Sequence, residues 1–254
     1  MLQLDFVAPN LTATLEGEID HHSSQYLRTR IDEAVEATHP KRLTMDFSQV
    51  SFMDSSGIGL VMGRFKLMKQ LGGSVEVTGA SGSIKRGMTL GGWTNWRPSI
   101  KRMAEKEECK MKAENETTIC CLSRSTNEGY IRTAVAAFLC QLDPMVDELA
   151  DIKTAVSEAA TNAIVHGYPD RLGKIWVKVQ IYPGRLVCIR IKDKGVGIPD
   201  VEQAMEPLYT TASDRERAGL GFSVMADFMD KLTVRSAPGT GTTVVLKKTL
   251  RALE

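Results

Sequence analysis

The sequence has no long apolar run and no surplus of charge of either sign. No hydrophobic stretch approaches the roughly 20 residues that a membrane-spanning helix needs. The beginning of the chain, MLQLDFVAPN, carries an acid where a secretory signal has a basic start and an apolar core. The formal net charge is +1, so composition gives no electrostatic argument for nucleic acid or an anionic membrane as partner. We therefore expect a cytoplasmic protein with neither partner.

Two motifs are also absent. The five cysteines form no C-x-x-C pair, so the usual zinc and redox motifs built on that pair are excluded. The sequence G-x-x-x-x-G-K-[ST] does not occur, which excludes a P-loop as the phosphate cradle. Any phosphate site in this chain must be of another type.

The first half of the chain alternates strand and helix patterns. Helical spacing of apolar residues from Ile58 onward would face a sheet, and Gly72-Gly73 then ends that helix. Helical crossovers of this length between strands predict a β/α layer with some parallel pairing. Strands are expected at 2–7, 11–19, 43–47 and 74–79, and helices at 23–37 and 55–71.

The second half follows a different plan, in which strands tend to neighbour each other in sequence. The turn pair Pro183-Gly184 joins two of them, and Pro238-Gly239 turns a final hairpin. This order predicts an α/β sandwich with helices on one face of a mostly antiparallel sheet. Strands are expected at 117–122, 174–182 and 186–193, and helices at 126–142, at 145–166 and from Phe222.

Between the halves, residues 101–116 are dominated by charged side chains and have little apolar periodicity. A helix is one interpretation, and a solvated tether is the one that we favour. The sequence thus predicts two α/β domains, at residues 1–96 and 115–254, joined by a charged linker at 97–114.

The first candidate site in the second half is S157-E-A-A-T-N-A-I-V-H-G167. Glu158, Asn162 and His166 are spaced at i, i+4 and i+8, so one helical stripe presents a carboxylate, an amide and an imidazole. A carboxylate can serve as general base towards a hydroxyl, and an amide oxygen is a suitable Mg²⁺ ligand. Taken alone, the stripe is better read as a polar helix surface, and His166 is better read as structural.

Two glycine-containing segments follow. In D193-K-G-V-G197, an Asp at the end of a strand can accept a hydrogen bond from an adenine amino group, and the glycines allow close approach of the backbone. In E216-R-A-G-L-G221, glycines precede a helix whose N-terminus can bind phosphate. Each segment alone is weak evidence, since strand ends and helix starts often look like this.

In this order, the three segments resemble the N, G1 and G2 boxes of the Bergerat-fold ATPases. Over residues 115–250 the resemblance narrows to the sporulation anti-sigma-F factors, which are serine kinases, through FLCQLDPMVDELADIKTAVSEAATNAIVHGY and RERAGLGFSVMADFMD. The resemblance implies ATP and Mg²⁺ as cofactors. It implies Glu158 as the catalytic base, Asn162 as the Mg²⁺ ligand and Asp193 as the adenine contact.

The same resemblance implies further nucleotide and partner contacts. Arg217 would reach the γ-phosphate, and Thr242 would contact the nucleotide, although it is equally readable as an ordinary strand residue. Arg132 matches a position that contacts both the sigma factor and its antagonist. The remaining nucleotide-binding positions are Gly195, Gly197, Gly219 and Gly221.

In the first half, the informative segment is V50-S-F-M-D-S-S-G-I-G59. Asp54 is a good helix N-cap, which places Ser55 and Ser56 in the first turn. A phosphate added there would meet the positive end of the helix. Taken alone, these residues favour the interpretation that the segment is only a helix cap.

Residues 1 to about 90 resemble a STAS domain of the sporulation anti-sigma-F factor antagonists, through GEIDHHSSQYL and SFMDSSGIGLVMGRFKLMKQLGG. The resemblance implies Ser55 as the phosphoacceptor, with the loop that contains Asp20, His21 and His22 close to it. Two adjacent histidines lack further ligands, so we expect a polar loop and no metal there. The sequence departs from the family after about Gly87, and a frameshift that fused two adjacent coding regions would explain this.

The two resemblances imply that an anti-sigma factor kinase and its own substrate share one chain. Such a chain would control a sigma factor by partner switching, in which the kinase binds either the sigma factor or the antagonist. Its expected partners are a sigma factor of RNA polymerase, a STAS-domain antagonist in cis or in trans, and a second copy through the kinase domain. The alternative is a binding scaffold in which nucleotide only orders residues 206–219.

Overall fold

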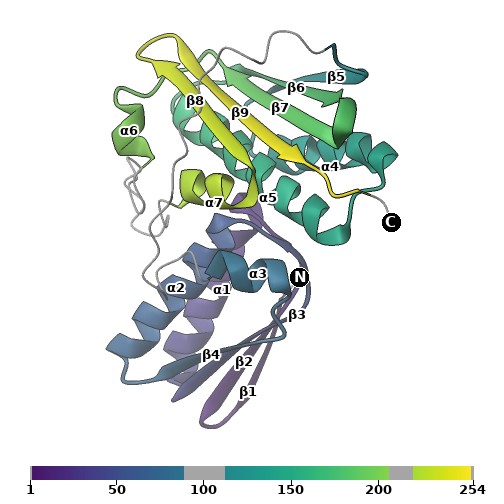
Figure 1. Ribbon diagram of the computed structural model, residues 1–254. Helices are drawn as coiled ribbons and strands as arrows, with labels where there is room; N and C mark the ends of the chain where they lie inside the picture. Colours follow the sequence, from purple (N-terminus) through teal and green to yellow (C-terminus); the bar gives the residue numbers. More distant parts are fainter. Residues whose placement is uncertain (1, 89–111, 206–219, 253–254) are drawn as a thin grey trace. The chain divides into compact units, whose positions relative to one another are not determined.

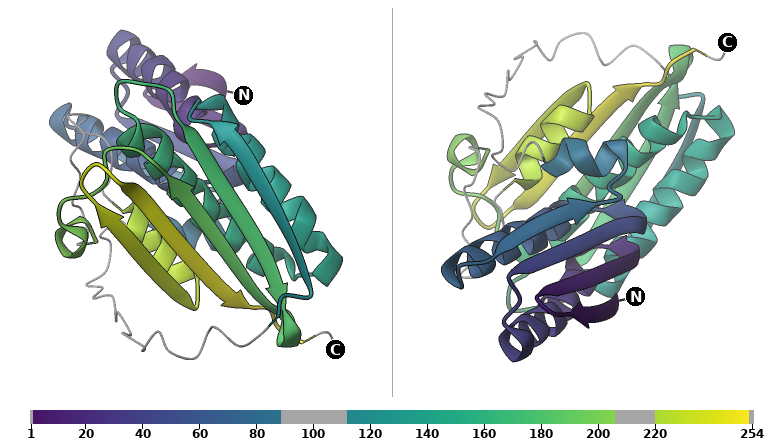
Figure 2. Two further views of the ribbon diagram at one scale, coloured as in Figure 1. Left: turned by 90° about the horizontal axis from the view of Figure 1, so that it is seen from above. Right: turned by 90° about the horizontal axis from the view of Figure 1, so that it is seen from below.

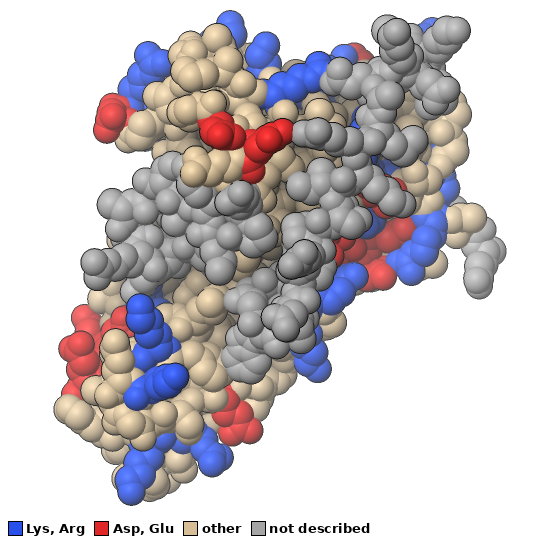
Figure 3. All heavy atoms as spheres, turned by 60° about the vertical axis from the view of Figure 1, so that its left-hand side comes forward, with Lys and Arg blue, Asp and Glu red and all other residues tan. Residues whose placement is uncertain are grey.

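The computed structural model describes residues 2–88, 112–205 and 220–252, which belong to two compact units (Figure 1). Residues 2–88 lie in the first unit, and the other two ranges lie in the second. In these ranges no helix is both long enough and apolar enough to cross a membrane. On the face drawn in Figure 3, acidic and basic side chains are interspersed, as expected from the near-zero net charge.

The first unit is a four-stranded sheet with helices. The strand order is β1-β2-β3-β4, in which β1 and β2 are antiparallel and the other two pairs are parallel. The β/α layer with parallel pairing is therefore confirmed. The elements are β1 (Leu2–Val7), β2 (Asn10–Ile19), α1 (His21–Thr38), β3 (Arg42–Met53), α2 (Ser55–Gln70), β4 (Ser74–Thr78) and α3 (Gly82–Met88).

The core of this unit lies between the sheet and helices α1 and α2. Buried residues alternate along β2, as Leu11, Ala13 and Leu15, which gives that strand one apolar face. Ile31 of α1 and Leu60 of α2 are fully buried as well. The two helices are also joined by an ion pair of 2.7 Å between Arg64 and Asp32.

Helix α1 begins earlier than its apolar pattern indicates. The Asp20 side chain accepts a hydrogen bond from the Ser23 backbone N–H at 2.9 Å, and the Ser23 hydroxyl accepts one from the Asp20 N–H at 2.9 Å. This capping box fixes the first turn. His21 and His22 therefore belong to the helix, and the expectation of a loop at these residues is wrong.

The second unit is an α/β sandwich. Its five-stranded sheet has the order β5-β6-β7-β9-β8, with every pair antiparallel. Helices α4, α5 and α7 lie on one face of this sheet (Figures 1 and 2). The regular elements are β5 (Asn115–Leu122), α4 (Thr126–Leu139), α5 (Val146–Asn162), β6 (Lys174–Tyr182), β7 (Leu186–Asp193), α6 (Val201–Ala204), α7 (Gly221–Phe228), β8 (Lys231–Ala237) and β9 (Gly241–Thr249).

Apolar residues of the central strands and of the helices form one core in this unit. Val177 and Val179 of β6 belong to the same buried cluster as Ile152 and Val156 of α5, and all four are fully buried. The predicted sandwich is confirmed. The charged linker predicted at 97–114 lies largely outside the described residues, so its character and the domain boundaries remain predictions.

Candidate nucleotide site

The predicted polar stripe lies on α5 and on the turn that follows it. Glu158 and Asn162 are on the helix, whereas His166 lies in a π-helical turn, Ala163–Gly167. Turns of this type interrupt α-helices at many functional sites. Here the turn carries the chain from the helix towards the end of β7, because the Gly167 carbonyl accepts a hydrogen bond from the Val196 N–H at 2.9 Å.

The first residue of α7 lies directly against this stripe. A Cβ atom added to Gly221 would stand 3.0 Å from Glu158 Oε2 and 3.5 Å from Asn162 Nδ2. The first distance is short for a new carbon atom and the second is an ordinary van der Waals contact, so a side chain at Gly221 would crowd the Glu158 carboxylate and touch the Asn162 amide. The fold thus brings together a carboxylate, an amide and the N-terminus of a helix, where free backbone N–H groups favour anions.

Asp193 ends β7 with its side chain inside the unit. Its Oδ1 atom accepts hydrogen bonds from the backbone N–H groups of Gly195, at 2.8 Å, and of Thr242, at 3.2 Å. The residue is 3% exposed, and burial raises the pKa of its carboxyl group, an effect that the backbone donors partly oppose. The other oxygen, Oδ2, receives neither of these two hydrogen bonds. The predicted residues Asp193, Gly195 and Thr242 therefore meet at one place.

The glycines of the D193-K-G-V-G197 loop are required by close packing. A Cβ atom on Gly195 would lie 1.9 Å from the Gly167 carbonyl oxygen. Gly197 has φ of +74°, and a Cβ atom there would lie 2.1 Å from the Ala237 carbonyl oxygen. The loop is held between the end of the α5 segment and the β8–β9 turn.

Two residues that sequence reasoning missed hold the same loop. The Tyr168 hydroxyl accepts a hydrogen bond from the Lys194 N–H at 2.8 Å and donates one to the Lys174 carbonyl at 2.8 Å. The Ser236 hydroxyl accepts from the Ile198 N–H at 2.8 Å and lies 2.9 Å from the Thr242 hydroxyl. Ser236 stands in no motif, and Tyr168 is only the last residue of the stretch that carries the family resemblance, directly after His166-Gly167.

The raised pKa of Asp193 leads to a stability prediction. Because the pKa in the folded state lies above the ordinary value, ionisation of this carboxyl destabilises the nucleotide-free protein as pH rises through that pKa. In Asp193→Asn, the amide oxygen can still accept from the two backbone donors without a buried charge. We expect the Tm of the nucleotide-free variant to be a few degrees higher at pH 7, with the gain shrinking as the pH falls. Calorimetry measures this, with the exposed Asp170→Asn as control; a lower Tm would contradict it.

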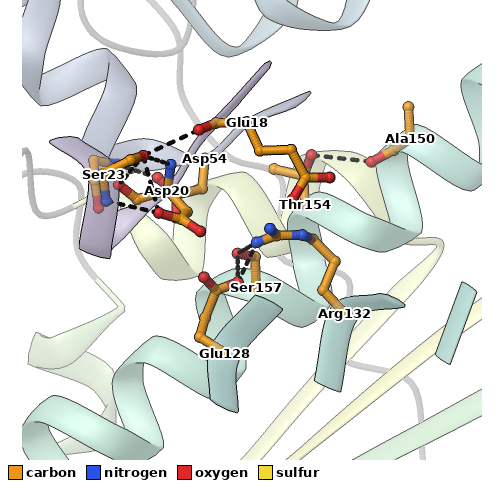
Figure 4. A network of polar contacts seen from close by, with 10 residues as sticks. Glu18, Asp20, Ser23, Asp54, Glu128, Arg132, Ala150, Thr154 and Ser157 are labelled. Atoms are coloured by element: carbon orange, nitrogen blue, oxygen red, sulfur yellow. Dashed lines mark hydrogen bonds and ion pairs between the residues drawn. The ribbon is translucent and has the colours of Figure 1, made fainter. Parts of the chain in front are cut away.

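Arg132 lies on α4 and joins it to α5. Its guanidinium contacts the Glu128 carboxylate and lies 3.2 Å from the Ser157 hydroxyl, which also contacts Glu128 (Figure 4). Ser157 immediately precedes Glu158, so the arginine is linked to the polar stripe. Its predicted partner contacts remain a prediction. Two predicted nucleotide contacts, Arg217 and Gly219, lie outside the described residues.

In the first unit, Asp54 caps α2 as expected. Its Oδ1 atom accepts a hydrogen bond from the Ser56 N–H at 2.8 Å, and Ser55 is the first residue of the helix. The Asp54 N–H donates to the Ile19 carbonyl at 3.1 Å, which places the start of α2 beside the end of β2. The segment around Asp20 therefore lies near Ser55, as predicted.

Comparison with known proteins matches both units. The model of the histidine kinase-like ATPase domain matches residues 123–248, and the model of the STAS domain matches residues 3–105. The anti-sigma F factor of Thermoanaerobacter sp. (strain X514) is 55% identical over 127 residues, which are 50% of this chain and 88% of that protein. The chain belongs to the anti-sigma F factor family. The anti-sigma F factor of Clostridium beijerinckii is 53% identical over 137 residues, 54% of this chain and 95% of that protein.

Two solved structures are also similar. The unphosphorylated anti-sigma factor antagonist SpoIIAA is 30% identical with a TM-score of 0.34, over 36% of this chain and 81% of that chain. The RsbU and RsbW domains of Rv1364c from Mycobacterium tuberculosis are 18% identical with a TM-score of 0.39, over 54% of this chain and 32% of that chain. The family assignment rests on the sequence matches. These matches show an N-terminal STAS domain and a C-terminal ATPase domain. The ATPase domain implies that the chain binds ATP.

Proposed function

We propose that the second unit is an ATP-dependent serine kinase. Its substrate is Ser55 of the STAS domain, either in the same molecule or in another copy of the chain. In its ATP-bound form this unit sequesters a sigma factor. The unphosphorylated STAS domain displaces that factor, and phosphorylation of Ser55 ends the displacement. The family supports the sigma-factor part of this proposal, and the site supports the enzymatic part.

The observation that carries the enzymatic part is the closeness of Gly221 to the side chains of Glu158 and Asn162. A helix N-terminus, which suits phosphate, is held beside a carboxylate that can take a proton. Asp193 lies at the end of β7 with Oδ2 available for an adenine amino group, while its loop glycines keep the backbone close. These residues fit ATP.

In the proposed reaction the Ser55 oxygen attacks the γ-phosphorus, and the bond from that phosphorus to the β,γ-bridging oxygen breaks, which releases ADP. The serine proton passes to the Glu158 carboxylate. Mg²⁺, when bound, would neutralise charge on the phosphates, and the Asn162 amide oxygen is a fitting ligand. Arg217 and Gly219 would complete the phosphate site, together with Gly197.

Phosphorylation of Ser55 would change the surface at the start of α2. The new phosphate would add about two negative charges beside the Asp54 carboxylate, which is fixed by the Ser56 N–H. The helix N-terminus would favour the added charge, so the STAS domain would stay folded. An acidic partner surface that binds this end of α2 would instead be repelled by the negative charges of the phosphate and of Asp54.

Incubation of the purified chain with Mg²⁺ and [γ-³²P]ATP tests the proposal. If the chain is a kinase, ³²P should stay on the protein after denaturation. The Ser55→Ala chain should not be labelled. Ser56→Ala, a matched change one residue further along α2, should still be labelled. Binding of ATP without incorporation of label would refute the kinase and favour the nucleotide-ordered scaffold.

A further inference from the structure

The sheet of the second unit has a face opposite to α4, α5 and α7, and we call it the outer face. Along β6, buried residues alternate with residues that point to this face, and β7 follows the same alternation of direction, although Cys188 is buried at an outward position. In the left-hand view of Figure 2 the strands of this sheet lie in front of the helices. The outward positions of β6 and β7 include no acidic residue; they are Lys174, Trp176, Lys178, Gln180, Tyr182, Leu186, Cys188, Arg190 and Lys192.

Basic side chains on the outer face surround one tryptophan. Trp176 is paired with Lys192 across the strands, and Lys178 is paired with Arg190. The Lys194 ammonium lies 5.4 Å from the centre of the Trp176 ring. Lys192, Lys194 and Arg190 are exposed, and Trp176 is half-buried. We call these residues the tryptophan patch: Lys174, Trp176, Lys178, Arg190, Lys192 and Lys194.

One acidic side chain reaches the patch from the next strand. Glu116 of β5 forms an ion pair of 2.9 Å with Lys178 and accepts a hydrogen bond from Gln180 at 2.9 Å. Among the described residues Glu116 is the one carboxylate that an ion pair joins to the patch, so its five cations leave the patch positive, although the whole chain carries a net charge of only +1. The near-neutral composition therefore conceals a local separation of charge, which only the strand register reveals.

We propose that the tryptophan patch binds single-stranded nucleic acid. Outward residues on one strand are ~6.7 Å apart and neighbouring strands ~4.8 Å apart, so the cations form a flat grid that can follow a phosphate backbone. An unpaired base can stack on the Trp176 ring, as bases stack on aromatic side chains of other single-strand binding sheets. The base would take the place of the Lys194 ammonium, which would then contact a neighbouring phosphate.

The chemistry of the patch argues against two other partners. Lysine is depleted at protein–protein interfaces, yet four of the six patch residues are lysines. Adsorption to a membrane is strengthened by apolar side chains that enter the lipid, in addition to the attraction of cations to anionic headgroups. The tryptophan is instead half-buried among cations, and its ring is approached by Lys194. The bases of a duplex are paired and cannot stack on Trp176, so a duplex could contact only the basic side chains of the patch.

Fluorescence anisotropy of a labelled 20-nucleotide oligo(dT) with the full chain tests the proposal. We expect salt-sensitive binding to the wild type and weaker binding to a 20-base-pair duplex. Trp176→Ala should weaken oligo(dT) binding by about tenfold. The double variant Lys178→Gln/Lys192→Gln should do the same or more. Lys66→Gln/Lys69→Gln, which removes the same charge from exposed positions of α2, should bind as the wild type does.

The controls separate stacking from charge and from misfolding. Each patch variant should keep the thermal shift that ATP produces, since the substituted side chains lie on the outer face, whereas the side chains of Asp193 and Glu158 are buried inside the unit. No oligo(dT) binding at micromolar protein would overturn the proposal. It would also be overturned if Trp176→Ala bound unchanged, if the α2 variant lost as much affinity as the patch variant, or if poly-glutamate or anionic vesicles bound as tightly as oligo(dT).

Discussion

Replacement of Glu158 by glutamine is expected to slow phosphoryl transfer to Ser55 by about 10²–10⁴-fold, the usual contribution of a general base. Glutamine keeps the size of the side chain and its place beside Gly221, but it cannot accept the serine proton. ATP affinity should change little, because the carboxylate would act on the serine and not on the nucleotide. Single-turnover rates, with ATP binding measured separately, test both statements.

The control for this experiment is Asp227→Asn, an equivalent change at an exposed position of α7. It should transfer phosphate at the wild-type rate. A Glu158→Gln chain that bound ATP tenfold or more weakly would show that this carboxylate contributes to binding, and the assignment of Glu158 as the base alone would be wrong. Wild-type transfer by the variant would remove Glu158 from the mechanism altogether.

Asp193→Asn is expected to weaken ATP binding by about 10- to 100-fold, since a hydrogen bond to a charged, buried acceptor is lost or reversed. The two backbone donors, from Gly195 and Thr242, would still find an amide oxygen, so the loop should keep its shape. The amide can instead donate to a guanine carbonyl. The preference for ATP over GTP should therefore narrow as well.

Equilibrium titrations with ATP and GTP measure this change, with Asp170→Asn as the matched control. Combined with the higher Tm expected for the nucleotide-free variant, weaker binding would show that a buried charge is kept for recognition at a cost in stability. Unchanged ATP affinity would mean that adenine is recognised elsewhere, and Asp193 would then serve only to order its own loop.

Sequence patterns predicted the elements of the second unit well where turns are marked. Strands 174–182 and 186–193 were predicted residue for residue, because Pro183-Gly184 separates two alternating runs. Helix α1 was predicted to begin two residues too late, since its capping box depends on an Asp20–Ser23 pair that apolar spacing does not detect. Local signals thus located the elements, and side-chain hydrogen bonds fixed their ends.

The motif residues of the candidate site could be predicted from the sequence, but the residues that hold the loop by hydrogen bonds could not. Asp193, Gly195 and Thr242 were named from motifs, and the structure places them together. Tyr168 and Ser236 were missed because their hydrogen bonds join segments that only the folded chain brings close. The tryptophan patch was missed for a related reason: Trp176 and Lys192 become neighbours through the strand register.

The central claim is that this chain contains a kinase and its own substrate, and phosphosite mapping tests it most directly. The full chain is incubated with Mg²⁺ and ATP, digested and analysed by tandem mass spectrometry, beside the Glu158→Gln chain. The account predicts one phosphate, on Ser55, in the wild type and essentially none in the variant. Phosphate on Ser56 alone, or none on residues 2–88, would contradict it.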